Sequence, residues 1–161
     1  MPNLVVVLPL EPLQVGESFA VKSWPLHITV LPPFKTDAAS SEIADVIAAV
    51  TSGQTALTAI AGHDEMFGRR EDVPVTVIED DPALTQLHHA LVDALRPFAA
   101  RPDDRAFTGR GFRAHVTIKG PRRVHEGDVL PLTQIALVDM APRSAPGGRV
   151  VLATVPLPVP E

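Results

Sequence analysis

The chain has 161 residues, of which 45% are apolar and 20% charged, proportions typical of one soluble globular domain. It contains no cysteine, which excludes disulfides, thiolate zinc sites and a catalytic thiol. The net charge of −5 argues against a protein that binds long double-stranded nucleic acid. The chain begins without a basic, apolar leader and lacks the roughly 20-residue apolar run of a membrane span, so we expect a cytoplasmic protein with no membrane association.

Hydrophobic periodicity and turn residues predict an α+β chain with a largely antiparallel sheet, because strands and helices do not alternate regularly. Ser41 can cap a first helix that Gly53 ends, and Asp81-Pro82 should start a second helix that runs to about Phe98. Pro32-Pro33 should end the second strand, since neither residue can donate to a sheet. The expected strands are 5–8, 26–31, 56–61, 73–78, 112–119, 132–138 and 150–155, with turns or loops at 9–25, 62–72, 101–111 and 145–148 and an extended surface tail at 156–161.

One short pattern occurs twice, 88 residues apart: His, a β-branched residue, Thr, a β-branched residue, two variable positions and Pro. The two copies are His27-Ile28-Thr29-Val30 and His115-Val116-Thr117-Ile118, within the stretches 26–33 and 112–121. Side chains alternate between the faces of a strand. Each copy should therefore bury its β-branched pair and present an imidazole and a hydroxyl on the other face.

Two such strands facing one another would supply two proton-transfer groups and two neutral hydrogen-bond donors, which suits acid–base chemistry on a phosphate ester. The alternative is that each histidine is a half-buried strand residue satisfied by a neighbour, but the repeat makes this explanation less attractive than it is for one copy. The repeat also suggests two related lobes within one domain, the first ending near residue 60 and the second beginning near residue 73.

Half of the fourteen Lys and Arg residues lie between positions 101 and 123. A positive field around His115 suits a small anionic ligand or a nucleic-acid end, although such runs often form only a solvated surface. Lys119 falls on the same strand face as His115 and Thr117, so we expect it to bind substrate. Arg113 is a second candidate for substrate binding.

Trp24 and Phe112 each lie three residues before a motif histidine. Either ring could stack on a nucleobase, or simply pack in the core. His88-His89 cannot bind one metal ion together, because adjacent helical positions diverge by about 100°. The stretch His63-Asp64-Glu65 is expected to form a turn rather than a cation site, and no metal site is expected elsewhere.

The double motif resembles the two-histidine (2H) phosphoesterase superfamily, and is most similar to the branch of bacterial RNA 2′,5′-ligase-like proteins and cyclic nucleotide phosphodiesterases. The likeness covers most of the chain, including the short first strand, the motif spacing, Trp24 before His27 and the Leu- and His-rich helix before the second motif. It implies a bilobal α+β sandwich of two pseudo-symmetric lobes with the motifs facing each other in a central groove. It implies no metal or other cofactor.

The chain departs from this family in two places. Residues 11–23 are short and rich in turn formers where relatives usually have a helix, so this lobe could be trimmed and its groove more open. Lys119 stands where many relatives have Arg, which keeps the positive charge but loses bidentate contact with a phosphate.

The resemblance implies an enzyme that hydrolyses a cyclic phosphodiester, such as a 2′,3′-cyclic phosphate on a nucleotide or RNA end. His27 and His115 would serve as general acid and base, in an order that the sequence does not set. Thr29 and Thr117 would donate hydrogen bonds to phosphate oxygens. The alternatives are a 2′–5′ RNA ligase, a phosphodiesterase for linear or cyclic oligonucleotides, a module that only binds nucleotides or RNA ends, and a structural domain whose repeat is fold symmetry alone. We expect a monomer in every case.

Overall fold

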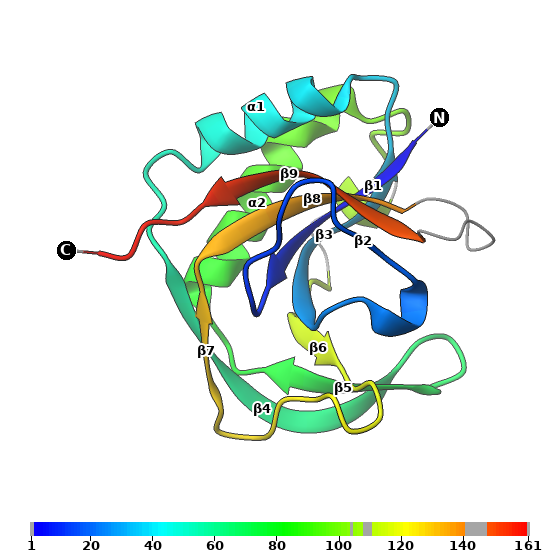
Figure 1. The fold of residues 1–161 in the computed structure, drawn as a ribbon, viewed down its shortest axis with the longest axis vertical. Coiled ribbons are helices and arrows are strands. Elements are labelled where there is room, and N and C mark those ends of the chain that lie inside the picture. The colour runs from blue at the N-terminus through cyan, green and yellow to red at the C-terminus, as the bar shows by residue number, and fades with distance from the viewer. Residues whose placement is uncertain (1, 104, 108–110, 141–147, 161) are drawn as a thin grey trace.

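A computed structural model describes residues 2–103, 105–107, 111–140 and 148–160. Within these ranges nine strands form one curled antiparallel sheet in the order β2-β9-β8-β1-β3-β6-β5-β4-β7 (Figure 1), so the α+β class is confirmed. The strands are β1 (Asn3–Pro9), β2 (Ser18–Phe19), β3 (His27–Lys35), β4 (Leu57–Phe67), β5 (Val73–Ile78), β6 (His115–Thr117), β7 (Val129–Leu132), β8 (Gln134–Asp139) and β9 (Arg149–Pro156). The helices are α1 (Ser40–Val50) and α2 (Pro82–Leu95), with single 3₁₀ turns at Val21–Ser23, Arg96–Phe98 and Arg105–Phe107.

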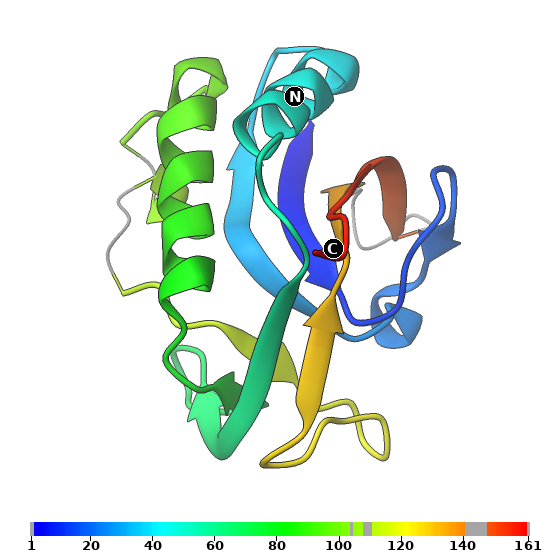
Figure 2. The same ribbon diagram turned by 90° about the vertical axis from the view of Figure 1, so that its left-hand side faces the viewer.

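The two α-helices lie side by side against one face of the sheet (Figure 2). That face carries the larger apolar core, which includes Ile28, Val30 and Val116 of the central strands and the apolar stripe of α2. A smaller cluster lies on the opposite face, where Val5, Val7, Leu13, Trp24, Ala136, Val138 and Val151 pack together. In the part of the chain that the structure describes, no helix is long and apolar enough to cross a membrane.

The two lobes meet between β3 and β6 at the centre of the sheet. The first lobe contains β1, β2, β3, β8 and β9, and the second contains β4, β5, β6 and β7. The prediction that the first lobe ends near residue 60 and the second begins near residue 73 is therefore wrong. The chain passes from the first lobe to the second through α1 and returns to the first lobe at Thr133, between β7 and β8. As a result, β8 pairs with the N-terminal strand β1, and β9 pairs with β8.

Both predicted helices are present, but only the start of α2 follows the predicted cap. The Asp81 carboxylate accepts from the backbone N–H groups of Ala83 and Leu84 at 3.0 and 3.3 Å, as an N-cap should. Helix α1 begins at Ser40 without a side-chain cap, so Ser41 lies inside its first turn. Its C-terminus is closed by Thr51, whose hydroxyl donates to the carbonyl of Ile47 at 2.7 Å, and not by Gly53.

The prolines at 32 and 33 do not end the first motif strand. Strand β3 continues to Lys35 because the prolines fall in an irregularity of the β1–β3 ladder, between the pairs Val6↔Leu31 and Leu4↔Phe34. At a bulge a residue need not donate to the neighbouring strand.

Three further strand boundaries are wrong, and two segments predicted to lie on the surface contain buried residues. Strand β4 extends to Phe67, so most of the expected turn at 62–72 pairs with β5. The second motif strand shrinks to three residues, since Lys119 already pairs with Arg122 in a turn. The expected strand at 132–138 divides between β7 and β8, and the tail buries Leu157. Ala106 and Phe107 of the expected polar loop are also buried; Arg110 and residues 145–147 lie outside the described ranges.

Candidate functional site

The four motif side chains belong to one face of the central strands. Ile28 pairs with Val116 across the antiparallel β3–β6 seam, and both residues are buried in the helix-side core. Extending this register by one residue sets His27 opposite Thr117 and Thr29 opposite His115. In such a ladder, directly opposite side chains are about 5 Å apart and diagonal ones about 7–8 Å. The two histidines are therefore diagonal neighbours, with each threonine across from the histidine of the other motif.

Both imidazoles are held by the same backbone contact. Nδ1 of His27 donates to the carbonyl of Pro25 at 2.8 Å, and Nδ1 of His115 donates to the carbonyl of Arg113 at 2.8 Å. A carbonyl oxygen can only accept, so in both rings Nδ1 carries the proton. This leaves Nε2 of each histidine as the nitrogen able to exchange a proton with a ligand.

Each histidine also packs against an aromatic ring, and a cationic side chain lies over the same ring. Trp24 stacks on His27 with ring centroids 4.0 Å apart, and Phe67 meets His115 edge-on at 4.7 Å. The Lys119 ammonium lies 5.7 Å from the centre of the Trp24 ring, while the Arg113 guanidinium lies 5.2 Å from that of Phe67. The two halves of the site therefore share an arrangement of imidazole, aromatic ring and cation as well as a sequence motif.

The environment of His27 is poorly solvated and positively charged. Burial lowers the pKa of His27 to about 4, assisted by the charges of Lys119, His115 and Arg149, although its hydrogen bond to Pro25 acts in the opposite direction. The imidazole of His27 is therefore neutral at pH 7. The pKa of Lys119 is also lowered, first by burial and then by the charges of Arg122 and Arg149.

Lys119 was expected to share the strand face of His115 and Thr117, but it follows the end of β6 and lies on the His27 side of the site, over the Trp24 ring. Its ammonium donates to the carbonyl of Trp24 at 2.6 Å, and the chain turns immediately afterwards at Gly120, where φ is +61°. The two arginines that follow Lys119 in the basic run have structural contacts. Arg122 donates to the carbonyl of Lys22, and Arg123 binds the carboxylate of Asp64.

The other three predicted binding residues lie around these histidines in different ways. Trp24 is buried under His27 and belongs to the smaller core, so it supports the imidazole. Arg113 donates to the carboxylate of Glu65 from its two terminal guanidinium nitrogens, at 3.0 and 2.5 Å. Phe112 stacks on His88 at 4.1 Å, with the ring planes only 6° apart.

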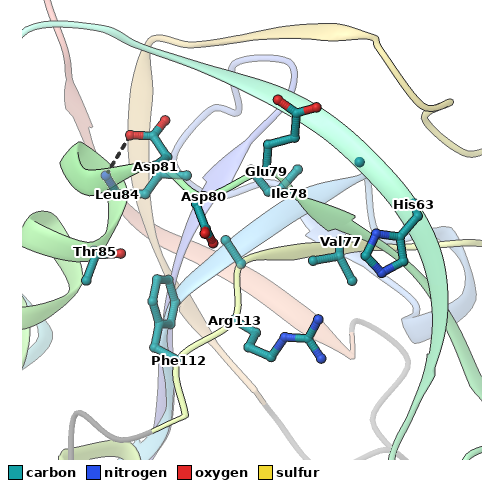
Figure 3. A pocket seen from close by; sticks show the side chains of 12 residues that line it. His63, Val77, Ile78, Glu79, Asp80, Asp81, Leu84, Thr85, Phe112 and Arg113 are labelled. Carbon is teal, nitrogen blue, oxygen red and sulfur yellow. Dashed lines mark hydrogen bonds between the residues drawn. The ribbon is translucent and has the colours of Figure 1, made fainter.

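Phe112 and Arg113 also line a cavity of about 330 Å³ at the start of α2 (Figure 3). This cavity does not include the motif histidines, but it borders His115 through Val77, the cross-strand partner of His115. The other lining residues are Gly62, His63, Ile78, Glu79, Asp80, Asp81, Leu84, Thr85 and Ala114.

Sequence reasoning missed Phe67, Glu65 and Arg149. The first two lie in the stretch that was expected to be a turn, because the polar run at residues 63–65 lacks the alternation typical of a strand. Arg149 is buried on β9, with its guanidinium 5.3 Å from the centre of the Trp24 ring. It lies 34 residues beyond His115 in a different part of the sheet, and nothing in the sequence pattern connects it to either motif.

Comparisons with known proteins agree with the fold. The family model for the 2′-5′ RNA ligase superfamily matches residues 7–128. Similar solved structures include TT0787 of Thermus thermophilus (16% identity, 100% of both chains covered, TM-score 0.64) and Escherichia coli LigT with NADP⁺ (17%, 98% of both chains, 0.59) or with 3′-AMP (16%, 98% of both chains, 0.57). No curated protein sequence matches the chain.

Proposed function

Because this chain belongs to the 2′-5′ RNA ligase superfamily of two-histidine phosphoesterases, we propose that it hydrolyses a cyclic phosphodiester, such as the 2′,3′-cyclic phosphate of a nucleotide or RNA end. The observation that carries this proposal is the paired arrangement of the motifs. Two imidazoles with the same Nδ1–carbonyl contact lie diagonally across one antiparallel seam, each opposite a threonine of the other motif.

In the proposed reaction the two histidines have different roles. His27 is neutral at pH 7 because burial holds its pKa at about 4, so its Nε2 can take a proton from the attacking water. The water oxygen forms a bond to phosphorus and the bond to one ribose oxygen breaks. That oxygen receives a proton from Nε2 of His115, and the product is a phosphomonoester.

The threonines and Lys119 would stabilise the charge that develops on the phosphate. The hydroxyls of Thr29 and Thr117 can donate to non-bridging oxygens, where negative charge increases in the transition state. Lys119, held by the carbonyl of Trp24, adds positive potential on the His27 side. The 3′-AMP bound to the similar LigT structure carries the 3′-phosphate that opening a 2′,3′-cyclic ring at the 2′ oxygen would leave, which supports a small nucleotide as the ligand.

The test is hydrolysis of 2′,3′-cyclic nucleotides and of an RNA ending in a cyclic phosphate, measured in EDTA. We expect wild type to open the ring, and His27→Ala and His115→Ala each to lose about 100-fold or more in activity, as the loss of a general base or acid should cause. His125→Ala is the matched control, because His125 is exposed and lies outside both motifs.

Two results would contradict this proposal. Near-wild-type turnover by either single variant would exclude two-histidine catalysis. A folded but inert wild type that still binds 3′-AMP would make the chain a binding module. That binding is measurable without turnover, because the single tryptophan of the chain, Trp24, stacks on His27 and its fluorescence should respond.

A further inference from the structure

Two of the residues that line the cavity beside His115 also interact with His115 of the candidate site. Val77 lines the cavity and pairs with His115 across the β5–β6 ladder. Arg113 also lines it, and the carbonyl of Arg113 accepts the hydrogen bond that orients the His115 ring. A nucleotide phosphate held at the motifs would therefore lie next to the mouth of this cavity.

One wall of the cavity is a supported aromatic ring. His88 covers one face of Phe112, and the Nδ1 atom of His88 donates to the carbonyl of Val30 at 2.8 Å. Burial lowers the pKa of His88, so this partner is a neutral ring. Figure 3 shows Phe112 at the edge of the cavity, between Thr85 and Arg113. A ring supported in this way can serve as a stacking platform for a planar ligand.

The polar lining of the cavity favours hydrogen-bond donors over anions. Glu79, Asp80 and Asp81 contribute three carboxylates, and Asp81 already caps α2. The Arg113 guanidinium is bound by Glu65, which neutralises the cation that a phosphate would otherwise use. Asp80 lines the same cavity as Phe112 and Arg113, and its charge helps to raise the pKa of Arg113, so its carboxylate is available on this side of the cavity to accept from an amino group.

We propose that this cavity binds a nucleobase bearing an exocyclic amino group, stacked on Phe112 with the amino group hydrogen-bonded to Asp80. The inference rests on the proposed function, since the phosphate of the same nucleotide or of its neighbour would occupy the motif site. Adenine, cytosine and guanine carry such an amino donor, whereas uracil does not. The cavity would therefore select the base while the motifs react with the phosphate.

The first test is equilibrium binding of 3′-AMP, 3′-CMP and 3′-UMP, followed by amide NMR shifts. We expect 3′-AMP and 3′-CMP to bind several-fold more tightly than 3′-UMP and to shift the amides of Thr85 and Ala114. Asp80→Ala removes the acceptor and should abolish most of this preference, and Asp45→Ala, an exposed change on α1, should preserve it. Matched dinucleotides ending in a 3′-phosphate form the second arm, and a preference found only there would assign the cavity to the neighbouring base.

Inorganic phosphate separates the failure of this proposal from the failure of the proposed function. It should shift the amides of His27 and Thr117 and leave those of Thr85 and Ala114 in place. Absence of that response would count against the phosphate site itself. Equal affinity for amino-bearing and amino-free bases in both arms, or a preference that survives Asp80→Ala, would overturn the nucleobase site.

Kinetics provide a second readout through a substrate without a base, glycerol 1,2-cyclic phosphate. We expect Phe112→Leu to lower the ratio of kcat/KM for 2′,3′-cyclic AMP to kcat/KM for this diester by about 5- to 100-fold, the usual range for loss of one base–aromatic stack. Asp45→Ala should leave the ratio unchanged. A ratio that stays constant in Phe112→Leu, with folding verified by circular dichroism, would exclude stacking on Phe112.

Discussion

His27 and His115 are held by equivalent backbone carbonyls but differ in what surrounds them. His27 stacks on the buried ring of Trp24, within reach of the charges of Lys119 and Arg149, and burial holds its pKa at about 4. A partly buried imidazole beside cations remains a free base at neutral pH. At the scale of single residues, this difference supports His27 as the proton acceptor.

The pH dependence of kcat/KM should report this proton acceptor. Because His27 must be neutral to accept a proton, we expect the acid limb of the profile to have its midpoint near pH 4, well below the 6.5 of an ordinary histidine. Steady-state rates on a 2′,3′-cyclic nucleotide between pH 3.5 and 8 would measure it. An acid limb near pH 6.5 would contradict the assignment of His27 as the base.

Lys119→Met should move that acid limb to higher pH, because the charge of Lys119 lowers the pKa of His27 and the variant removes it. The same change should raise KM, since a positive group near the phosphate is lost. Lys119→Arg is the matched control, because it keeps the charge and should retain a low acid limb. Identical pH profiles for Lys119→Met and wild type would exclude this electrostatic role.

Thr117→Val should lower kcat by about 100-fold, a typical effect of removing one donor to a developing oxyanion. Valine has nearly the same shape, so packing at the β6 seam should be preserved. Thr117→Ser keeps the hydroxyl and should recover most of the activity. Equal activity of the Val and Ser variants would mean that the hydroxyl does not contact the reacting phosphate.

At the scale of elements, β4 brings residues of the second lobe to the site, although its sequence does not indicate a strand there. The strand continues past Ala61 through an irregularity in its pairing with β5, and so brings Glu65 and Phe67 to Arg113 and His115. The charged residues at 63–65 look like a turn when considered alone. Their pairing with a separate strand decides the structure, since sheet formation depends on contacts between distant segments.

The N-cap of α2 is the element-scale feature whose energetic contribution can be measured most directly. Asp81→Ala removes an acceptor for the N–H groups of Ala83 and Leu84 and should lower the free energy of unfolding by about 1 kcal/mol. Asp81→Asn keeps an acceptor oxygen and should cost much less. Urea denaturation at pH 7 measures both. Equal stability of Asp81→Ala and wild type would show that the cap contributes nothing.

For the whole molecule, the lowered pKa of His27 predicts a loss of stability at acid pH. The unfolded chain binds a proton at His27 near pH 6.5, whereas the folded chain does so only at about pH 4. Stability is therefore complete above pH 6.5 and declines as the pH falls toward 4. Linkage gives a decrease of about 2 kcal/mol in the free energy of unfolding between pH 7 and pH 5.

Urea denaturation of wild type and His27→Gln at these two pH values isolates this effect. His88 also has a pKa lowered by burial and contributes in the same direction, so the difference between the two proteins is the quantity to compare. We expect the decrease to be smaller in His27→Gln by about the amount assigned to His27. An equal decrease in both proteins would contradict the lowered pKa.

Much of the candidate site was predictable because its information is local. A period of two sets His27 with Thr29 and His115 with Thr117, and the β-branched residues between them indicate the buried face. The helical spacing and the Asp81-Pro82 cap likewise determine α2. These features depend on backbone geometry within a few residues, which the sequence expresses directly.

Other features were decided only by the tertiary structure. The sequence alone could not show that β3 and β6 pair at Ile28 and Val116, that β8 and β9 return to the first lobe, or that Arg149 lies over the ring that supports His27. Nor could it show that Phe112 stacks on His88 beside a cavity and away from Trp24. Each of these contacts joins residues far apart in the chain, and long-range pairing is determined by the packing of the whole sheet rather than by local preference.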